Sequence, residues 1–530
     1  MLGGMQDFEL RVPRLIDHAA REHGSRELVT RWADGSEVRT DWAGVARDAR
    51  KLAQALTRLG MKPGDRIATL GMNHGPHIVA WYGAIGMGGV IHTINPRLFD
   101  EQLIYIANHA EDRILFYDKA FQPIVDRLRG QWTTIEQYVV FDGHGPDGFA
   151  ALLAPEDGDY AWHEGPERDP CMLCYTSGTT GHPKGVLYEH RSTMIHAMAE
   201  VAPWVFNMSK RSVILPIVPM FHAAAWGLPF AGALAGSKFV YSASNDAKTI
   251  CDLMNREKVT HSAGVPTVWL AMFRHMDATG DAPRFLEQVT IGGSAAPRAM
   301  IARIMDMGVE VKHLWGMTET SPIGSAGTPP VDWDELDREE RLDLIGKQGS
   351  VPFGIELRVV DDEGVIQPRD GKSSGRLQVR GPWVLKRYFK GEEDAVDADN
   401  WFDTGDVSVI HPDGVMQITD RAKDVIKSGG EWISSVDLEN AACGCAGVHE
   451  AAAIGVHHPK WDERPILLVV RKPGSAVSAD EVQAHLGLHV AKWWLPDEVH
   501  FVDELPHTAT GKLLKTAIRE QYKDFRLGVS

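Results

Sequence analysis

The first part of the chain alternates between the hydrophobic period of strands and that of helices. "RELVTRW" and "SEVRTDW" flank the turn "ADG", which predicts a β-hairpin. Apolar residues then recur at helical spacing from Val45 to Leu56. A strand, a helix and a strand are predicted next, in "DRIATLGMN", "HIVAWYGAIGM" and "GVIHTIN".

The same order returns further along, in "SVILPIVPMFH", "WGLPFAGALAG" and "KFVYSAS". Its middle segment predicts an apolar helix that includes Trp226. Strands that alternate with helices favour parallel sheets covered by helices. We therefore expect an α/β fold with two similar α/β subdomains.

The remaining segments have other patterns. Residues 328–349 are charged, with "VDWDELDREERLD", and predict a loop-rich, solvated surface. Residues 354–418 show short strands and the turn signals "DDEG", "RDGK" and "HPDG", which predict a small β unit. The last hundred residues predict an α+β domain, with a capping box from Ser478 to Glu481. We place the domain boundary in "TDRAKDVIKSGGE", which gives domains 1–421 and 422–530.

Composition narrows the possible partners. The 530 residues carry a formal net charge of −17, which disfavours nucleic acids and anionic membranes. No apolar run reaches the roughly 18 residues that span a bilayer, and the start has no signal-peptide pattern. Five cysteines in this length suit a reducing cytoplasm. Neither Cys171 and Cys174 nor Cys443 and Cys445 have a second pair at zinc-ligand spacing, so we expect structural roles.

"YTSGTTGHPKG" gathers small hydroxyl residues, glycines and Lys184 between a predicted strand, "CMLCYT", and a predicted helix, "HRSTMIHAMAEVA". Backbone amides and hydroxyls of such a loop can hold phosphate oxygens, and a lysine adds charge. The spacing differs from that of the common P-loop. From composition alone, a flexible surface loop is an equal alternative.

The string "TSGTTGHPKG" resembles the phosphate loop of the acyl-adenylate-forming (AMP-binding) enzymes, and the resemblance extends over nearly the whole chain. It implies ATP as a co-substrate, Mg²⁺ as a cofactor and a small, mobile C-terminal domain. The implied phosphate contacts are Thr176, Ser177, Gly178, Thr179, Thr180, Gly181 and Lys184, and Thr176 also contacts the metal.

"WGMTETSP" resembles the family segment that places an aromatic on adenine, a threonine on the α-phosphate and a glutamate on magnesium. These positions are Trp315, Thr318 and Glu319 here, although the family's usual aromatic is tyrosine. "GGSAAP" resembles the backbone wall between adenine and the acyl chain; by itself it is typical of a tight turn. The further nucleotide contacts implied are Gly293, Ser294, Ala295, Ala296, Pro297, Gly316 and Met317.

"WFDTGDV" and "DRAKDVIKSGGEWIS" resemble the segments that bind ribose and form the hinge. They imply ribose contacts at Asp406 and Arg421, a nucleotide contact at Ile418 and the hinge at Lys423. Without the resemblance, Asp406 is interpreted as a turn residue and Arg421 as a surface charge. The implied path for CoA is formed by Ser428, Gly429, Gly430, Glu431 and Trp432.

"LPHTATGKLLK" matches the family's catalytic-lysine loop, which makes Lys512 the catalytic lysine. The resemblance also implies that His222 in "PMFHAAAW" lies near the substrate carboxylate, and that Trp226 and Gly293 lie beside the acyl chain. A structural histidine and a packing tryptophan are the alternatives. Thr318 and Glu319 complete the predicted catalytic residues, and Glu319 is the second metal ligand.

The resemblance implies an acid–CoA ligase with two steps: carboxylate and ATP give acyl-AMP and pyrophosphate, then CoA gives acyl-CoA and AMP. No carrier segment follows "EQYKDFRLGVS", so we expect free CoA as the acceptor. "HHPKWDERP" is similar to the branch that activates medium-chain fatty acids and 3-methylmercaptopropionate. General fatty acyl-CoA synthetase activity, amino-acid adenylation and luciferase-like oxygenation remain alternatives. Analogy with relatives implies a homodimer.

Overall fold

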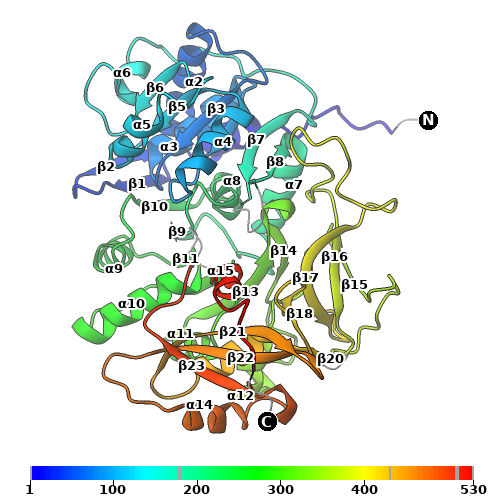
Figure 1. The fold of residues 1–530 in the computed structure, drawn as a ribbon. Coiled ribbons are helices and arrows are strands. Elements are labelled where there is room, and N and C mark those ends of the chain that lie inside the picture. The colour runs from blue at the N-terminus through cyan, green and yellow to red at the C-terminus, as the bar shows by residue number, and fades with distance from the viewer. Residues whose placement is uncertain (1–2, 177–181, 429–430, 508–512, 528–530) are drawn as a thin grey trace.

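The computed structural model describes residues 3–176, 182–428, 431–507 and 513–527. Within them the strands form four sheets, of six, eight, four and five strands. Figure 1 shows the helices gathered around the two larger sheets, in the blue-to-green part of the chain. The α/β class predicted from the sequence is confirmed.

The six-stranded sheet has the order β6-β5-β3-β4-β7-β8. Its predicted strand–helix–strand unit is confirmed as β3, α3 and β4. The sequence interpretation overlooked β8, which pairs antiparallel with β7 and separates the glycine-rich segment from helix α7. The strands are β3 (Arg66–Leu70), β4 (Val90–Thr93), β5 (Asp112–Tyr117), β6 (Gln137–Val140), β7 (Pro170–Tyr175) and β8 (Gly185–Glu189).

The eight-stranded sheet has the order β14-β13-β12-β11-β9-β10-β1-β2. The predicted hairpin is confirmed as β1 and β2, but it joins this second sheet through parallel pairing of β1 with β10, Leu28 opposite Phe239. The two halves of the large domain are therefore interlocked. The strands are β1 (Glu27–Arg31), β2 (Glu37–Asp41), β9 (Val213–Pro216), β10 (Lys238–Ser242), β11 (His261–Gly264), β12 (Gln288–Ile291), β13 (Glu310–Gly316) and β14 (Ile323–Ala326).

A layer of helices joins these two sheets. Helix α2 packs on α1 and α3, α1 also packs on α8, and α8 packs on α7. Gly83 permits the close approach of α3 to α2, since a Cβ there would lie 2.9 Å from the carbonyl oxygen of Ala49. The helices are α1 (Pro13–His23), α2 (Trp42–Arg58), α3 (Gly75–Gly86), α7 (His190–Glu200) and α8 (Leu228–Ala235).

Other helices cover the outer faces of the sheets. Helix α12 corrects the loop-rich interpretation of residues 328–349, because Asp337 caps it and Leu342 and Ile345 are buried in the apolar core. Its apolar positions are too few to stand out among the charges. The bounds are α4 (Asp100–Ala110), α5 (Gln122–Leu128), α6 (Phe149–Leu153), α9 (Ala247–Arg256), α10 (Pro266–Thr279), α11 (Arg298–Asp306) and α12 (Arg338–Gly346).

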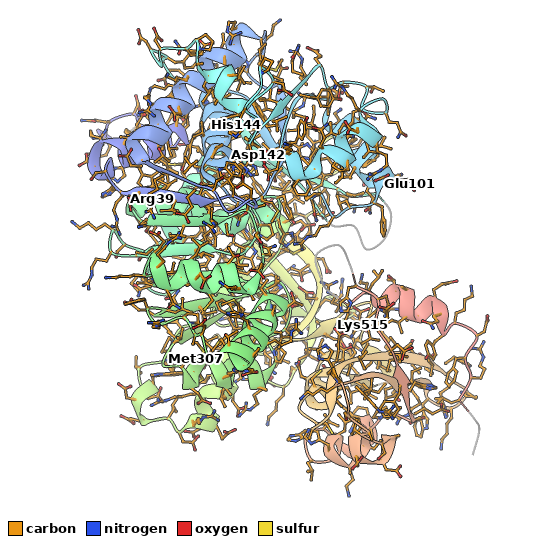
Figure 2. The ribbon with its side chains drawn as sticks, turned by 90° about the vertical axis from the view of Figure 1, so that its left-hand side faces the viewer. Arg39, Glu101, Asp142, His144, Met307 and Lys515 are labelled. Atoms are coloured by element: carbon orange, nitrogen blue, oxygen red, sulfur yellow. The ribbon has the colours of Figure 1, made fainter. Side chains whose placement is uncertain are left out.

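The predicted small β unit is confirmed as an antiparallel sheet in the order β15-β16-β17-β18. The residues after it form the five-stranded sheet. Strands β19, β21 and β23 pair with β22, and β20 pairs with β19. Figure 2 shows this orange-to-red part set to one side of the rest. The capping box from Ser478 to Glu481 is confirmed. In the described part of the chain, no helix has the length and hydropathy needed to cross a bilayer.

The strands of the two small sheets are β15 (Glu356–Val360), β16 (Gly375–Arg380), β17 (Phe402–Ile410), β18 (Met416–Arg421), β19 (Ile426–Ser428), β20 (Glu431–Ile433), β21 (Val448–His458), β22 (Asp462–Arg471) and β23 (Glu498–Val502). Their helices are α13 (Ser435–Cys443), α14 (Ala479–Leu486) and α15 (Lys515–Gln521).

Candidate active site

Neighbouring parallel strands bring separate candidate segments to one edge of the eight-stranded sheet. Strands β9, β11, β12 and β13 lie side by side, and their carboxyl ends lead to His222, Val265, Gly293 and Trp315. Ligands of open α/β sheets bind at this edge, where the loops after the strands meet. The topology therefore places the predicted acyl and adenine segments at neighbouring positions.

The hairpin of β7 and β8 is closed next to the predicted phosphate contacts. The Thr176 amide donates to the Lys184 carbonyl at 2.9 Å, and the Lys184 amide donates to Thr176 Oγ1 at 3.1 Å. The Lys184 ammonium lies 4.8 Å from the centre of the Tyr388 ring. Of the predicted phosphate contacts, Ser177, Gly178, Thr179, Thr180 and Gly181 lie outside the described residues.

Glu319 provides a buried carboxyl group close to this hairpin. Its side chain accepts a hydrogen bond from the Tyr388 hydroxyl at 2.8 Å. Burial raises the pKa of Glu319, while the Tyr388 hydrogen bond and the charge of Lys184 oppose that rise. The neighbouring Thr318 carbonyl accepts from the Tyr188 hydroxyl at 2.7 Å, which fixes the segment against β8.

This carboxyl group fits the magnesium predicted from the sequence. The described residues contain no group of three His, Cys, Asp or Glu side chains that could hold a metal alone. Mg²⁺ usually takes one or two protein carboxylates and completes its shell with phosphates and water. Glu319, with a hydroxyl from Thr176, is a donor set of that kind.

The predicted adenine and ribose residues contact each other directly. The Trp315 indole donates to Asp406 Oδ2 at 2.8 Å, and Asp406 is the cross-strand partner of Arg421. Trp315 also packs on Gly324, where no side chain would fit. A tyrosine ring has no N–H at this position, so the tryptophan adds a hydrogen bond that orients the aspartate. On β18, the Ile418 amide donates to Gln348 Oε1 at 2.7 Å.

The segment that carries Trp226 is a left-handed turn, which corrects the predicted helix. Ala223, Ala224, Ala225 and Trp226 have φ between 43° and 55°, and α8 begins only at Leu228. Left-handed backbone is costly for residues with a Cβ, alanine included, although branched and bulky side chains tolerate it less well. A local hydrophobic pattern gives no signal for it.

This turn lies near the glycine that follows β12, together with another apolar side chain. A Cβ added to Gly293 would lie 3.2 Å from Val265 Cγ1 and 3.9 Å from Trp226 Cζ2. Gly293 itself has a φ of +80°, which favours glycine. Ala296 and Trp226 are buried, whereas Ser294 and Ala295 are exposed.

Sequence reasoning missed several residues that hold the site together. Asn73 donates to the carbonyls of Pro216 and Val218 and accepts from the Met220 amide at 2.7 Å, and so fixes the segment before His222. Tyr388 lies in the charged stretch "KRYFKGEE" and gave no signal of its own.

A buried pair on α7 was also missed. His196 Nε2 accepts from the Ile323 amide at 3.2 Å, and its Nδ1 lies 3.4 Å from Glu200 Oε2. Glu200 lies against Gly227, where a Cβ would come within 2.4 Å of Oε2. The pair therefore supports both the Trp226 turn and the strand after Glu319. The signal available in the sequence was the spacing of four residues between His196 and Glu200, which places both side chains on one face of a helix.

The C-terminal candidates lie on other elements. Ser428 and Trp432 belong to β19 and β20, where Ser428 receives a hydrogen bond from Arg464 at 3.4 Å and Lys427 lies 6.0 Å from the Trp432 ring centre. Lys423 follows β18 and is exposed. Gly429, Gly430 and Lys512 lie outside the described residues, and Glu431 is described only as the first residue of β20.

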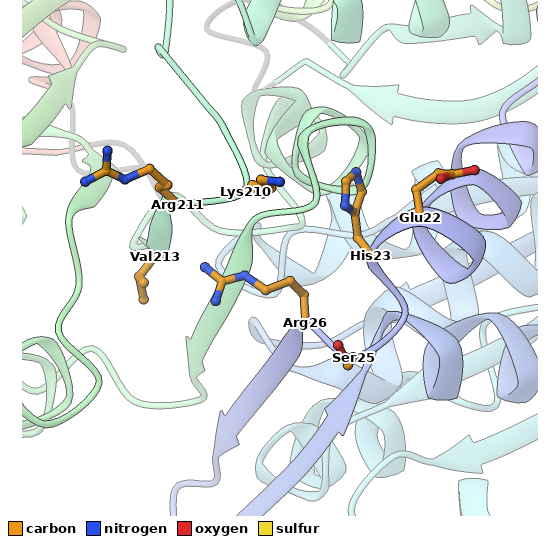
Figure 3. Close-up of a pocket in the computed structure, with 7 residues that line it drawn as sticks. All are labelled: Glu22, His23, Ser25, Arg26, Lys210, Arg211 and Val213. Atoms are coloured by element: carbon orange, nitrogen blue, oxygen red, sulfur yellow. The ribbon is translucent and has the colours of Figure 1, made fainter.

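An open pocket of about 600 Å³ lies elsewhere. Figure 3 shows it between α1, the start of β1 and the segment before β9. Val213 begins β9, so the pocket is at the amino end of the strand whose carboxyl end leads to His222. We therefore do not assign the candidate chemistry to it. It is lined by Glu22, His23, Ser25, Arg26, Lys210, Arg211 and Val213.

The first prediction concerns the ionisation of Glu319. Tyr388→Phe keeps the ring beside Lys184 but removes the hydroxyl that stabilises the carboxylate. We expect the pKa of Glu319 to rise by about one unit, since a hydrogen bond to a charged group contributes roughly 1.5–3 kcal/mol. Infrared titration of the ligand-free protein measures this, with Glu319→Gln identifying the carboxyl band. An unchanged or lower pKa would contradict the assigned contact.

Known proteins that are similar to this chain indicate its family. The family model of AMP-binding enzymes matches residues 16–389, and the model of their C-terminal domain matches residues 437–512. The chain is 45% identical to 3-methylmercaptopropionyl-CoA ligase of Ruegeria lacuscaerulensis, over 100% of both chains. It is 45% identical to a medium-chain-fatty-acid–CoA ligase of Ectopseudomonas oleovorans, over 99% of this chain and 98% of that one.

Among solved structures, the fold is similar to that of the anthranilate CoA ligase AuaEII in complex with anthranoyl-AMP. The TM-score is 0.87 at 24% identity, over 98% of this chain and 99% of the other. That likeness concerns the arrangement of elements, including the large N-terminal and small C-terminal parts. The matches to both family models and to full-length relatives show that the chain belongs to the AMP-binding enzyme family.

Proposed function

We propose that the chain is an ATP-dependent acid–CoA ligase that forms AMP. A substrate carboxylate oxygen attacks the α-phosphorus of ATP, and pyrophosphate leaves as the acyl-AMP forms. The CoA thiol then attacks the acyl carbon, loses its proton, and AMP leaves. The observation that carries the proposal is that Lys184, Glu319, Trp315 and Asp406 gather around the carboxyl end of β13, in a chain of this family.

In the first step the protein has to offset the repulsion between two anions. Lys512 bridges the carboxylate and the α-phosphate, while Lys184 and the residues from Ser177 to Gly181 bind the other phosphates. Glu319 and Thr176 would hold a magnesium ion, which would supply positive charge to the phosphates. His222 lies beside the substrate carboxylate, and Thr318 donates to the α-phosphate. Preorganised charge of this kind is usually the largest catalytic contribution.

Nucleotide binding has its own residues. Trp315 stacks on adenine, while Asp406 and Arg421 bind the ribose hydroxyls. Segments 293–297 and 316–317, with Ile418, complete the nucleotide contacts. The cross-strand position of Arg421 opposite Asp406 supports a shared ribose site.

The second step needs a path for the thiol. We propose that residues 422–530 rotate about Lys423 relative to residues 1–421. The rotation replaces Lys512 by the face that contains Ser428, Gly429, Gly430, Glu431 and Trp432, along which the pantetheine arm passes. The antiparallel pairing of β19 with β20 supports this assignment, since it brings Ser428 opposite Glu431.

The substrate is an apolar acid of short to medium length, 3-methylmercaptopropionate or a fatty acid. The apolar residues Trp226 and Val265 beside Gly293 support an uncharged acyl chain, and two relatives are named for these acids. We also propose that the enzyme acts in the cytoplasm, as a homodimer, without nucleic-acid or integral membrane partners.

A substrate panel tests the proposed function. AMP release with CoA is measured for acids from acetate to decanoate, 3-methylmercaptopropionate and 4-aminobutyrate. Pentanoate and 3-methylmercaptopropionate should agree in kcat/KM within about tenfold, because sulfur replaces one methylene. 4-Aminobutyrate places an ammonium where pentanoate has a methyl, and should be at least about 10²-fold worse. Preference for 4-aminobutyrate, or no CoA-dependent AMP release with any acid, would refute the proposal.

The acyl pocket generates a further prediction. Trp226→Leu enlarges the space beside Gly293, so kcat/KM for octanoate relative to butyrate should rise at least about tenfold. Trp81→Leu is the matched control, since Trp81 is equally buried but lies in α3. It should lower thermal stability without changing the ratio. The same ratio in both variants would mean that Trp226 only packs the core.

A further inference from the structure

A buried polar network crosses the proposed boundary between residues 421 and 422. Asp420, on β18, is 1% exposed and accepts from both the Ser435 amide at 2.6 Å and the Ser435 hydroxyl at 3.0 Å. Ser434 caps α13 and donates to the Thr419 carbonyl. The start of α13 is therefore bound to the end of β18, and a carboxylate at a helix N-terminus is favourable.

Lys515 extends the network into the last helix. Its ammonium is 2.6 Å from Ser435 Oγ and 2.6 Å from Glu439 Oε1. Glu439 also accepts from the Ala453 amide at 2.8 Å. The Ser435 hydroxyl donates to Asp420 and accepts from Lys515, so one ammonium connects β18, α13 and α15. Figure 2 shows Lys515 beside α15, on the side of the C-terminal part that faces the rest of the chain.

This lysine differs from the lysine just beyond the end of α15. The Lys515 side chain is 8% exposed, whereas the Lys523 side chain is 58% exposed and pairs with Glu520. A buried ammonium is costly unless partners replace its water, and here a carboxyl and a hydroxyl do so. Burial raises the pKa of Glu439 to about 7, and Lys515 opposes the rise. Glu439 can therefore take up a proton if the lysine is removed, which spares the fold an unpaired charge.

The network reaches the nucleotide site on one side and the lysine segment on the other. Asp420 precedes Arg421, the partner of Asp406 across β17 and β18. Lys515 comes three residues after Lys512. The described residues on either side of the Lys512 segment pair with each other: His507 forms a β-bridge with Leu513, and the Leu514 amide donates to the Pro506 carbonyl at 2.8 Å. His507 is also held by Glu450 at 2.8 Å.

We propose that Lys515 is a positioning residue that ties the segment carrying Lys512 to the ribose strand β18 through Ser435 and Asp420. The inference rests on the proposed function. Lys423, the proposed hinge, lies between Asp420 and Ser435 along the chain, so rotation there changes their relative position. In this proposal the network belongs to the arrangement that forms acyl-AMP, and it separates before the thiol reacts.

Single-turnover kinetics test this role in Lys515→Met. Pyrophosphate release from ATP and hexanoate should slow about 10²-fold, the size expected when a reacting group is misplaced by about 1 Å. Thioester formation from supplied hexanoyl-AMP and CoA should stay within about threefold, because that step does not use the network. Lys523→Met, with the same loss of charge at an exposed position, should leave both rates unchanged.

A second variant separates positioning from folding. Lys515→Met with Glu439→Gln removes the carboxyl that pairs with Lys515, while Asp420 keeps its hydrogen bonds from Ser435. At a pH where Glu439 is ionised, the midpoint of thermal unfolding should therefore return towards that of the unchanged protein while pyrophosphate release stays slow. Equal loss in both half-reactions, or recovery of pyrophosphate release in the double variant, would overturn the inference. If the unchanged protein released no pyrophosphate with any acid, the proposed function itself would fail.

Discussion

Two anions have to touch before this chemistry can begin, and the proposed mechanism depends on positive charge held between them. A carboxylate and a triphosphate repel each other, and the chain adds a formal net charge of −17. Its overall field therefore gives no help. In the proposed mechanism the positive charge is local: it comes from Lys184, Lys512 and a magnesium ion that Glu319 would hold. Everything else in the site orients these groups or keeps water from weakening them.

The fold meets this demand with parallel strands and a few buried polar contacts. The order β13-β12-β11-β9 brings residues as far apart in sequence as His222 and Trp315 to one edge. The Tyr388 hydroxyl then donates to Glu319 while the Tyr388 ring lies beside Lys184. Trp315, the predicted adenine residue, donates to Asp406. Asp420 extends this order to the C-terminal domain. A cation on the smaller domain can thus be positioned relative to the nucleotide without being fixed there.

Local patterns predicted the elements well and their partners poorly. Periodicity identified α2, the β3–α3–β4 unit and the capping box at Ser478, because each depends on neighbours in sequence. It missed the pairing of β1 with β10 and the left-handed turn before Leu228, which long-range contacts impose. Short motifs located Trp315, Glu319 and Asp406, but motifs carry no signal for Tyr388, Asn73 or Lys515, whose roles arise only from contacts. The domain boundary and the residue roles remain predictions.

The central claim is that the ammonium of Lys512 acts in acyl-AMP formation and not in thioester formation. Rapid-quench measurement of both half-reactions in Lys512→Ala tests it most directly. Pyrophosphate release should fall at least about 10²–10³-fold, the effect of losing one preorganised donor. Acyl-CoA formation from supplied acyl-AMP should stay within about threefold of the unchanged protein, because Lys512 has then left the reacting atoms. Equal losses in both steps would contradict the account.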